Sequence, residues 1–144
     1  MRIMVSACLL GENCKYNGGN NLNEQLVAAL KKHEVVPVCP EVLGGLETPR
    51  TPCEIVGGIV TDRNGVNRDV EFRSGAQAAL IIAMERNVEL IVLQSRSPSC
   101  GVGRVYDGTF SGTITNGNGV FAGMALEAGI KVVDVCDFLS ALNN

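Results

Sequence analysis

Four short apolar segments divide the chain, and each is followed by a polar or glycine-containing stretch. The segments cover residues 3–7, 35–38, 90–93 and 130–133. Each is too short for a buried helix, and Val, Ile and Leu at successive positions are typical of a strand that is covered on both faces. The pattern therefore predicts four buried strands.

Helical patterns lie between these strands. A first helix over 24–32 begins after Asn23, a favourable N-cap residue. The segment 69–87 is the clearest helix, since apolar residues recur there at a spacing of three to four. They are Phe72, Ala76, Ala79, Leu80, Ala83 and Met84. Residues 120–128 predict a third helix that stops at Gly129, and 137–144 predict a short last helix.

The alternation of strands and helices predicts the fold class. We expect an α/β, three-layer Rossmann-like domain with a mainly parallel sheet of about four strands and helices on both faces. The segment 54–66 carries paired glycines and an Asn64-Gly65 turn, and we expect it to form a small hairpin or an arm beside the sheet. A length of 144 residues, of which 46% are hydrophobic, suits one core, so residues 1–144 are expected to form a single domain.

The charge and hydropathy of the chain limit the classes of partner that it can bind. The formal net charge is −3, and the 12 Lys and Arg residues form no cluster, which disfavours polymeric nucleic acid as a partner. The sequence shows neither a long apolar run nor the pattern of a leader peptide. We therefore expect a cytoplasmic protein that does not associate with membranes; its oligomeric state is not determined by the sequence.

The chemistry of the chain is concentrated in its six cysteines. A cytoplasmic protein keeps its thiols reduced, so metal binding, catalysis and simple burial are the roles to consider. Cys8 follows the first predicted strand, Cys39 the second, and Cys100 lies in the loop after the third. Because the carboxyl ends of parallel strands share one edge of a sheet, where ligands bind, we expect these thiols to converge.

Three thiolates without an evident fourth ligand suggest a metal centre with an open position, as in catalytic sites. The lone histidine, His33, is expected at a helix end and is a poor candidate for the fourth ligand. Soft thiolates select zinc or an iron–sulfur cluster. A cubane cluster held by three cysteines would leave one iron free for a substrate atom.

Several motifs in order along the chain resemble those of a bacterial family long described as a domain of unknown function. They are Ser6-Ala7-Cys8-Leu9-Leu10-Gly11, Tyr16-Asn17-Gly18-Gly19, Pro37-Val38-Cys39-Pro40-Glu41, Thr48-Pro49-Arg50 and Ser95-Arg96-Ser97-Pro98-Ser99-Cys100-Gly101. The characterised members of that family are thiouracil desulfurases, and the resemblance runs from residue 1 to about residue 134.

The resemblance implies a [4Fe-4S] cluster held by Cys8, Cys39 and Cys100. It also implies an enzyme that uses the open iron to remove sulfur from a small thiolated compound such as a thiouracil. Sulfide would be released and water would replace it, without net redox change. The residues fit these roles: Glu41, two residues after Cys39, can activate water, and Ser97 and Ser99 can orient water or substrate.

The remaining cysteines keep alternatives open. Cys53 stands where the family commonly has alanine, so it is either incidental or the second ligand in place of Cys39. Cys14 is a reactive thiol, a possible further ligand, or neither. Cys136 has no motif around it, and we expect it to be buried.

Two further alternatives concern a loop and the function. The glycine-containing segment 108–112 is either an anion-binding loop or only a turn. The alternative to an enzyme is a non-catalytic zinc- or thiol-based metal-binding or sensing domain. The absence of close Cys-x-x-Cys pairs counts against it.

Overall fold

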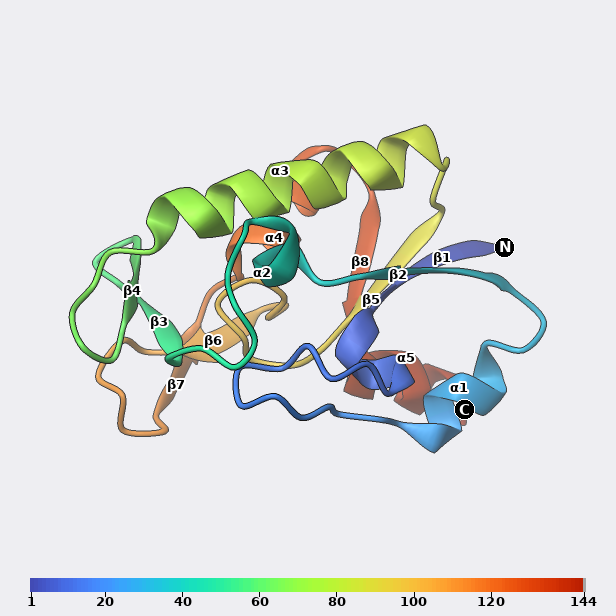
Figure 1. The fold of residues 1–144 in the computed structure, drawn as a ribbon. Helices are drawn as coiled ribbons and strands as arrows, with labels where there is room; N and C mark the ends of the chain where they lie inside the picture. The colour runs from blue at the N-terminus through green and yellow to red at the C-terminus, as the bar shows by residue number, and fades with distance from the viewer. Residues whose placement is uncertain (144) are drawn as a thin grey trace.

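The computed structural model describes residues 1–143 and contains a parallel four-stranded sheet in the order β2-β1-β5-β8 (Figure 1). The strands are β1 (Arg2–Ser6), β2 (Glu34–Val38), β5 (Leu90–Leu93) and β8 (Lys131–Asp134). All pairings in this sheet are parallel, and Met4 in β1 lies beside Val36 on one side and Ile91 on the other. The four predicted strands are confirmed.

Helices cover both faces of the sheet. In Figure 1, α3 (Asp69–Glu85) crosses above the sheet with α4 (Val120–Glu127) beneath it, while α1 (Glu24–Ala29) and α5 (Val135–Leu142) lie on the opposite side. Two separate apolar clusters follow from this arrangement, one against α3 and α4 and one against α1 and α5. The predicted α/β fold with helices on both faces is confirmed.

Successive strand residues point to opposite faces, and this explains the unbroken apolar runs. Ile3 and Val5 pack in the cluster with α1 and α5, whereas Met4 packs in the cluster with α3 and α4. The same alternation separates Val92 from Ile91. Because both faces are covered, the central positions of such a strand are apolar on both sides.

Local signals set two of the helix ends as expected. The Asn23 side chain accepts a hydrogen bond of 2.9 Å from the Leu26 amide and caps α1. Gly129 follows the end of α4 with a φ of +82°, the left-handed conformation that favours glycine.

One detail of the α3 prediction is wrong. Phe72, Ala76, Ala79 and Ala83 are fully buried, but the Met84 side chain is 57% exposed. At 3.6 residues per turn, Met84 is rotated by roughly 80° from Ala76 and away from the side on which Phe72 and Ala83 lie. Leu80, rotated by about half as much, is partly buried at the margin of the core.

The glycine-rich loops contain more structure than their sequence indicates. Residues 7–10 form a short 3₁₀ helix, η1 (Ala7–Leu10), and α2 (Pro40–Leu43) follows β2 directly. The expected hairpin is confirmed as β3 (Cys53–Val56) and β4 (Ile59–Asp62), and its tip is Gly57-Gly58, while Asn64-Gly65 forms a separate turn. A second hairpin, β6 (Arg104–Tyr106) with β7 (Ile114–Asn116), was not predicted because its strands are short and largely exposed.

The two hairpins lie together beyond the carboxyl ends of the sheet strands, on the left of Figure 1 and opposite the N-terminus. Glu54 of β3 joins them, because its buried carboxylate accepts hydrogen bonds from the Gly108 amide at 2.9 Å and the Phe110 amide at 3.2 Å. Two amides of the 108–112 loop therefore bind a carboxylate of the protein itself, so of the two alternatives for this loop, the external anion site is not supported.

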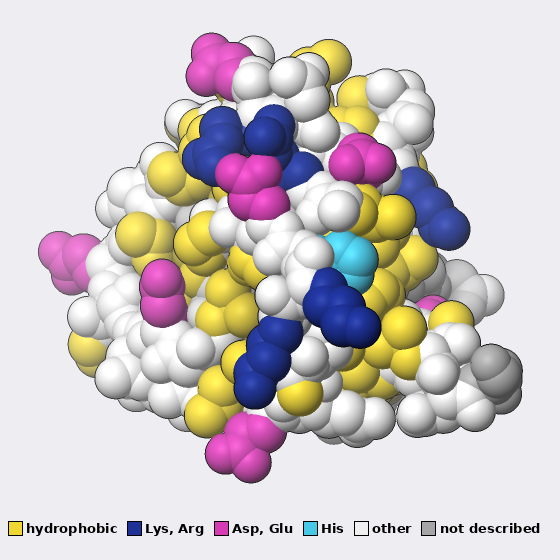
Figure 2. Space-filling model, turned by 90° about the vertical axis from the view of Figure 1, so that its right-hand side faces the viewer, with side chains coloured by type: hydrophobic (Ala, Val, Ile, Leu, Met, Phe, Trp, Pro, Cys, Tyr) yellow, Lys and Arg dark blue, Asp and Glu magenta, His cyan; other side chains and the backbone are white. Residues whose placement is uncertain are grey.

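The opposite end of the sheet carries mixed charge. Figure 2 views this end of the molecule and shows Lys and Arg side chains beside Asp and Glu side chains, with apolar side chains between them. Glu34, at the start of β2, pairs with Arg2 at 2.5 Å and Arg86 at 3.6 Å. Among the helices of residues 1–143, none combines the length and the apolar character needed to cross a bilayer.

Candidate active site

A cavity of about 450 Å³ opens at the carboxyl ends of the parallel strands. From β1 the chain crosses to β2 on one side of the sheet, and later strands are added on the other side, so the crossovers diverge between β1 and β5. Ligands of doubly wound sheets bind at such a switch point. Five of the six cysteines line this cavity: Cys8, Cys14, Cys39, Cys53 and Cys100.

The three expected ligands come from three different strands, as the sequence indicates. Cys8 lies in η1 directly after β1, where the Asn21 side-chain amide donates to its Sγ at 3.6 Å. Cys39 follows β2 and is the N-cap residue of α2. Cys100 lies in the turn after β5 and is only 6% exposed.

The surroundings of Cys8 and Cys100 favour the neutral thiol in the absence of metal. Burial raises the pKa of Cys8, and the neighbouring Cys39 and Glu41 raise it further. Burial also raises the pKa of Cys100 to about 12, against the opposing effect of the neighbouring Ser6 and Ser99 hydroxyls. A bound cationic metal centre would reverse this balance, because thiolates are the metal-binding form.

Cys14 and Cys53 both line the cavity, but they face different neighbours. Burial raises the pKa of Cys14 to about 12, and the next largest causes are Cys39 and Cys8. Burial also raises the pKa of Cys53 to about 12, but there the next causes are the carboxylates of Glu41 and Asp62. Cys14 therefore belongs to the group of clustered thiols, whereas Cys53 lies toward the acidic side chains.

Glu41 and Ser99 form a connected pair beside Cys100. The Ser99 hydroxyl donates to Glu41 Oε2 at 2.7 Å, and Ser99 Oγ lies 3.6 Å from Cys100 Sγ. Ser97 Oγ accepts a hydrogen bond of 2.7 Å from the Cys100 amide and lies 3.3 Å from Ser99 Oγ. The structure thus brings the three expected polar residues together, with Ser97 shaping the turn and Ser99 touching Glu41.

The position of Glu41 depends on a close contact between α2 and α3. A Cβ atom at Gly75 would lie 1.8 Å from the Pro40 carbonyl oxygen, and one at Gly44 would lie 2.0 Å from the Glu71 carbonyl oxygen. Only glycine at both positions allows the two backbones to approach this closely. The sequence signal for this contact is Gly75, a glycine within an otherwise strong helical pattern.

Helix α4 holds the turn that carries Ser99 and Cys100. Its first amides donate to that turn, Val120 N to Pro98 O at 2.8 Å and Phe121 N to Ser99 O at 2.9 Å. The preceding Gly119 packs so tightly that a Cβ there would lie 2.5 Å from the Ser99 carbonyl carbon.

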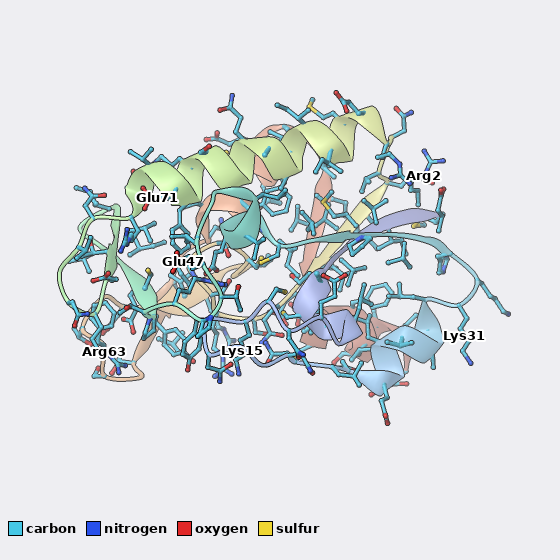
Figure 3. The ribbon with its side chains drawn as sticks, in the orientation of Figure 1. Arg2, Lys15, Lys31, Glu47, Arg63 and Glu71 are labelled. Atoms are coloured by element: carbon cyan, nitrogen blue, oxygen red, sulfur yellow. The ribbon has the colours of Figure 1, made fainter. Side chains whose placement is uncertain are left out.

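The hairpins supply the outer wall of the cavity. Tyr106 and Phe110 line it, and each ring has an arginine guanidinium 5.9 Å from its centre, Arg96 over Tyr106 and Arg63 over Phe110. Figure 3 shows Arg63, Glu47 and Lys15 at this end of the molecule, with Arg2 and Lys31 at the other. The aromatic wall was not predicted, because Tyr106, at the end of β6, and Phe110, in the loop after it, belong to a segment without a recognisable sequence pattern.

The structure also tests the expectations for Cys136 and His33. Cys136 is exposed in the first turn of α5, so its expected burial is wrong; the turn projects this side chain away from the face that packs on the sheet. His33 precedes β2, at the opposite end of the strand from Cys39, and does not line the cavity.

The donor set distinguishes the two kinds of metal centre. Within residues 1–143, no group of three or more His, Cys, Asp or Glu side chains is arranged to hold a single metal ion, so the zinc alternative is not supported. A cubane cluster is bound differently, since each cysteine binds a different iron and the thiols therefore stand farther apart. Several thiols around one cavity of this size fit such a cluster.

Comparisons with known proteins agree with this geometry. A relative from Bacillus subtilis (strain 168), the uncharacterized protein YbbK, is 40% identical over 141 residues, which cover 91% of this chain and 93% of that protein. A solved structure of the [4Fe-4S]-dependent thiouracil desulfidase TudS matches with a TM-score of 0.88 and 35% identity, over 99% of this chain and 97% of the other. The family model for 2-thiouracil desulfurase matches residues 3–136. This chain therefore belongs to the 2-thiouracil desulfurase family.

Proposed function

We propose that this protein is a [4Fe-4S]-dependent desulfurase that converts the thiocarbonyl of a small compound such as a thiouracil into a carbonyl. The observation that carries the proposal is the meeting of Cys8, Cys39 and Cys100 with the Glu41–Ser99 pair in one cavity at the carboxyl ends of the sheet strands. Family membership and the structural likeness to the thiouracil desulfidase support it.

The reaction balances without an electron donor or acceptor. The C=S bond is replaced by C=O, the oxygen comes from water, and the sulfur leaves as hydrogen sulfide with the two protons of that water. When bound, the cluster supplies an iron that acts as a Lewis acid toward the thiocarbonyl sulfur. The protein must then bring water to the thiocarbonyl carbon and take a proton from that water.

We assign the role of general base to Glu41. Water attacks slowly at neutral pH unless a base takes its proton as the bond forms. Each Glu41 oxygen already accepts one hydrogen bond, Oε1 from Arg50 and Oε2 from Ser99. A carboxylate has about four lone-pair sites, so two remain for water. Ser99 orients the carboxylate and lies 3.6 Å from Cys100 Sγ, while Ser97 keeps the Cys100 turn in place.

Tyr106 and Phe110 suit a planar heterocycle, since aromatic rings stack on such ligands. The substrate class we propose is therefore a small thiolated base or its nucleotide. The six free cysteines suit a reducing compartment, and we propose that residues 1–144 work as one domain in the cytoplasm.

The test is anaerobic reconstitution with iron and sulfide, followed by incubation with 2-thiouracil or 4-thiouracil. We expect a brown protein, release of sulfide, and formation of uracil in equal amount. Binding of zinc in place of iron by anaerobically purified protein, with no sulfide released from either compound, would rule the proposal out.

Glu41→Gln separates chemistry from cluster binding. The amide keeps the shape of the side chain and removes the base, so iron content should stay normal while turnover falls on the order of a hundredfold or more. Loss of iron in Glu41→Gln would make the residue structural or a ligand. Unchanged turnover would assign the base to another group.

A further inference from the structure

Arg50 lies in the loop between α2 and β3, and its side chain is only 8% exposed. Its guanidinium donates four hydrogen bonds: Nε to Glu41 Oε1 at 3.0 Å, Nη1 to Glu47 O at 3.2 Å and Thr48 Oγ1 at 3.0 Å, and Nη2 to Cys14 O at 2.9 Å. A buried cation is costly unless it is paired and hydrogen-bonded. Two of the residues that accept these hydrogen bonds, Cys14 and Glu41, line the cavity.

The contacts join segments that are far apart in sequence. Besides the Cys14 carbonyl, the loop that carries this cysteine is held by the backbone amide of Arg50, which donates to Tyr16 O at 2.7 Å. On the other side the guanidinium reaches α2 through Glu41. One residue thus fixes the Cys14 loop relative to the carboxylate.

Glu41 is oriented from both of its oxygens. Arg50 fixes Oε1, and Ser99 fixes Oε2 at 2.7 Å. The planar, rigid fork of arginine can hold the carboxylate and the Cys14 carbonyl simultaneously, whereas the single ammonium of lysine cannot reproduce that geometry.

We propose that Arg50 is a positioning residue of the reaction: it acts through Glu41 by holding this carboxylate in its working orientation and by tying the Cys14 loop to it. The inference rests on the proposed function, because it assigns Arg50 a task only if Glu41 serves the chemistry. It predicts that Arg50 contributes nothing to turnover once Glu41 has lost its carboxylate.

The test is a double-mutant cycle with Glu41→Gln and Arg50→Gln on anaerobically reconstituted protein. Arg50→Gln should lower kcat on the order of tenfold or more and leave KM and iron content near those of the wild type. The double variant should be no slower than Glu41→Gln alone, because the two residues act as one unit. Losses that multiply would show that Arg50 acts independently of Glu41 and would overturn the proposal, as would loss of iron in Arg50→Gln.

Conservative and rescue variants distinguish positioning from charge. Arg50→Lys keeps the charge but loses the fork, so it should resemble Arg50→Gln more than wild type. Added guanidinium at millimolar concentration should restore part of the turnover of Arg50→Ala and none of that of the double variant with Glu41→Gln. Arg73→Gln is the matched control, because it removes an exposed ion pair with Asp69 on α3. Wild-type turnover in Arg50→Lys, or no rescue of Arg50→Ala, would contradict the assigned role.

A measurement without turnover separates this inference from the proposed function. In cluster-free protein, Arg50→Gln should speed hydrogen exchange at the amides of Lys15 and Gly18, whose turn Arg50 holds. Unchanged exchange would refute the tie between Arg50 and this loop. If wild-type protein releases no sulfide from thiouracil, the proposed function fails, and the exchange experiment then decides on the tie alone.

Discussion

At the scale of single residues, the six cysteines are chemically alike and are separated by their surroundings. Changing Cys8, Cys39 or Cys100 to Ser should each abolish cluster retention, because a hydroxyl is a poor substitute for a thiolate on iron. Cys53→Ser and Cys136→Ser should retain the cluster. Iron per protein after anaerobic reconstitution measures the effect. Full iron in Cys39→Ser with loss in Cys14→Ser or Cys53→Ser would assign the second thiolate to that other cysteine.

Cys53 also gives a prediction about pH and stability. Its pKa is raised from 9.0 to about 12, mainly by burial, so the folded protein holds this proton more tightly than the unfolded chain. Its contribution to stability is complete below about pH 9 and is lost as the pH rises toward the folded pKa.

Cluster-free wild-type protein should therefore lose stability between about pH 8 and about pH 10 more steeply than Cys53→Ser. Urea unfolding at both pH values measures this difference. The exposed Cys136→Ser is the control and should keep the wild-type slope. Equal slopes in wild type and Cys53→Ser would show that Cys53 is not responsible.

At the scale of elements, the contact of α2 with α3 determines where Cys39 and Glu41 lie. Gly75→Ala should be destabilising by about 1–3 kcal/mol, because the new Cβ clashes with the Pro40 carbonyl and the clash outweighs the gain in helix propensity. Turnover should fall as well, since α2 must shift. Thermal or urea unfolding and a turnover assay test the two effects.

Gly123→Ala is the matched control. Gly123 also lies within a helix, α4, but a Cβ there would meet only the Asn118 side chain at an ordinary 3.8 Å. This substitution should be neutral or stabilising by up to about 1 kcal/mol. Equal destabilisation by the two substitutions would show that the close backbone contact is not the cause.

At the scale of the whole molecule, the core forms without help from the cavity. The buried clusters on the two sides of the sheet consist almost entirely of strand and helix side chains. Within residues 1–143, Cys100 is the only proposed ligand among the buried members of these clusters. Removal of the cluster with a chelator should leave the secondary structure and a cooperative thermal transition in place, unlike a small domain that folds only around its metal. Circular dichroism of the protein with and without iron tests this. Loss of cooperative unfolding would make the cluster part of the folding core.

The sequence by itself determined the four buried strands, the long helix and the edge at which Cys8, Cys39 and Cys100 meet. It could do so because strand and helix periodicities are local properties, and because parallel strands place their carboxyl ends on one side of a sheet. The motif around Cys39 also pointed to Glu41, because a carboxylate two residues from an expected thiolate ligand can be recognised without long-range information.

Only the tertiary structure decided which groups touch. Arg50 meets Cys14 across 36 residues, Ser99 meets Glu41 across 58, and Glu54 joins the hairpins across 54. The same is true of the Gly75 contact with α2, the exposure of Cys136 and the neighbours that separate Cys14 from Cys53. Such contacts depend on how packed elements approach one another, and hydrophobic spacing along the chain contains no information on that approach.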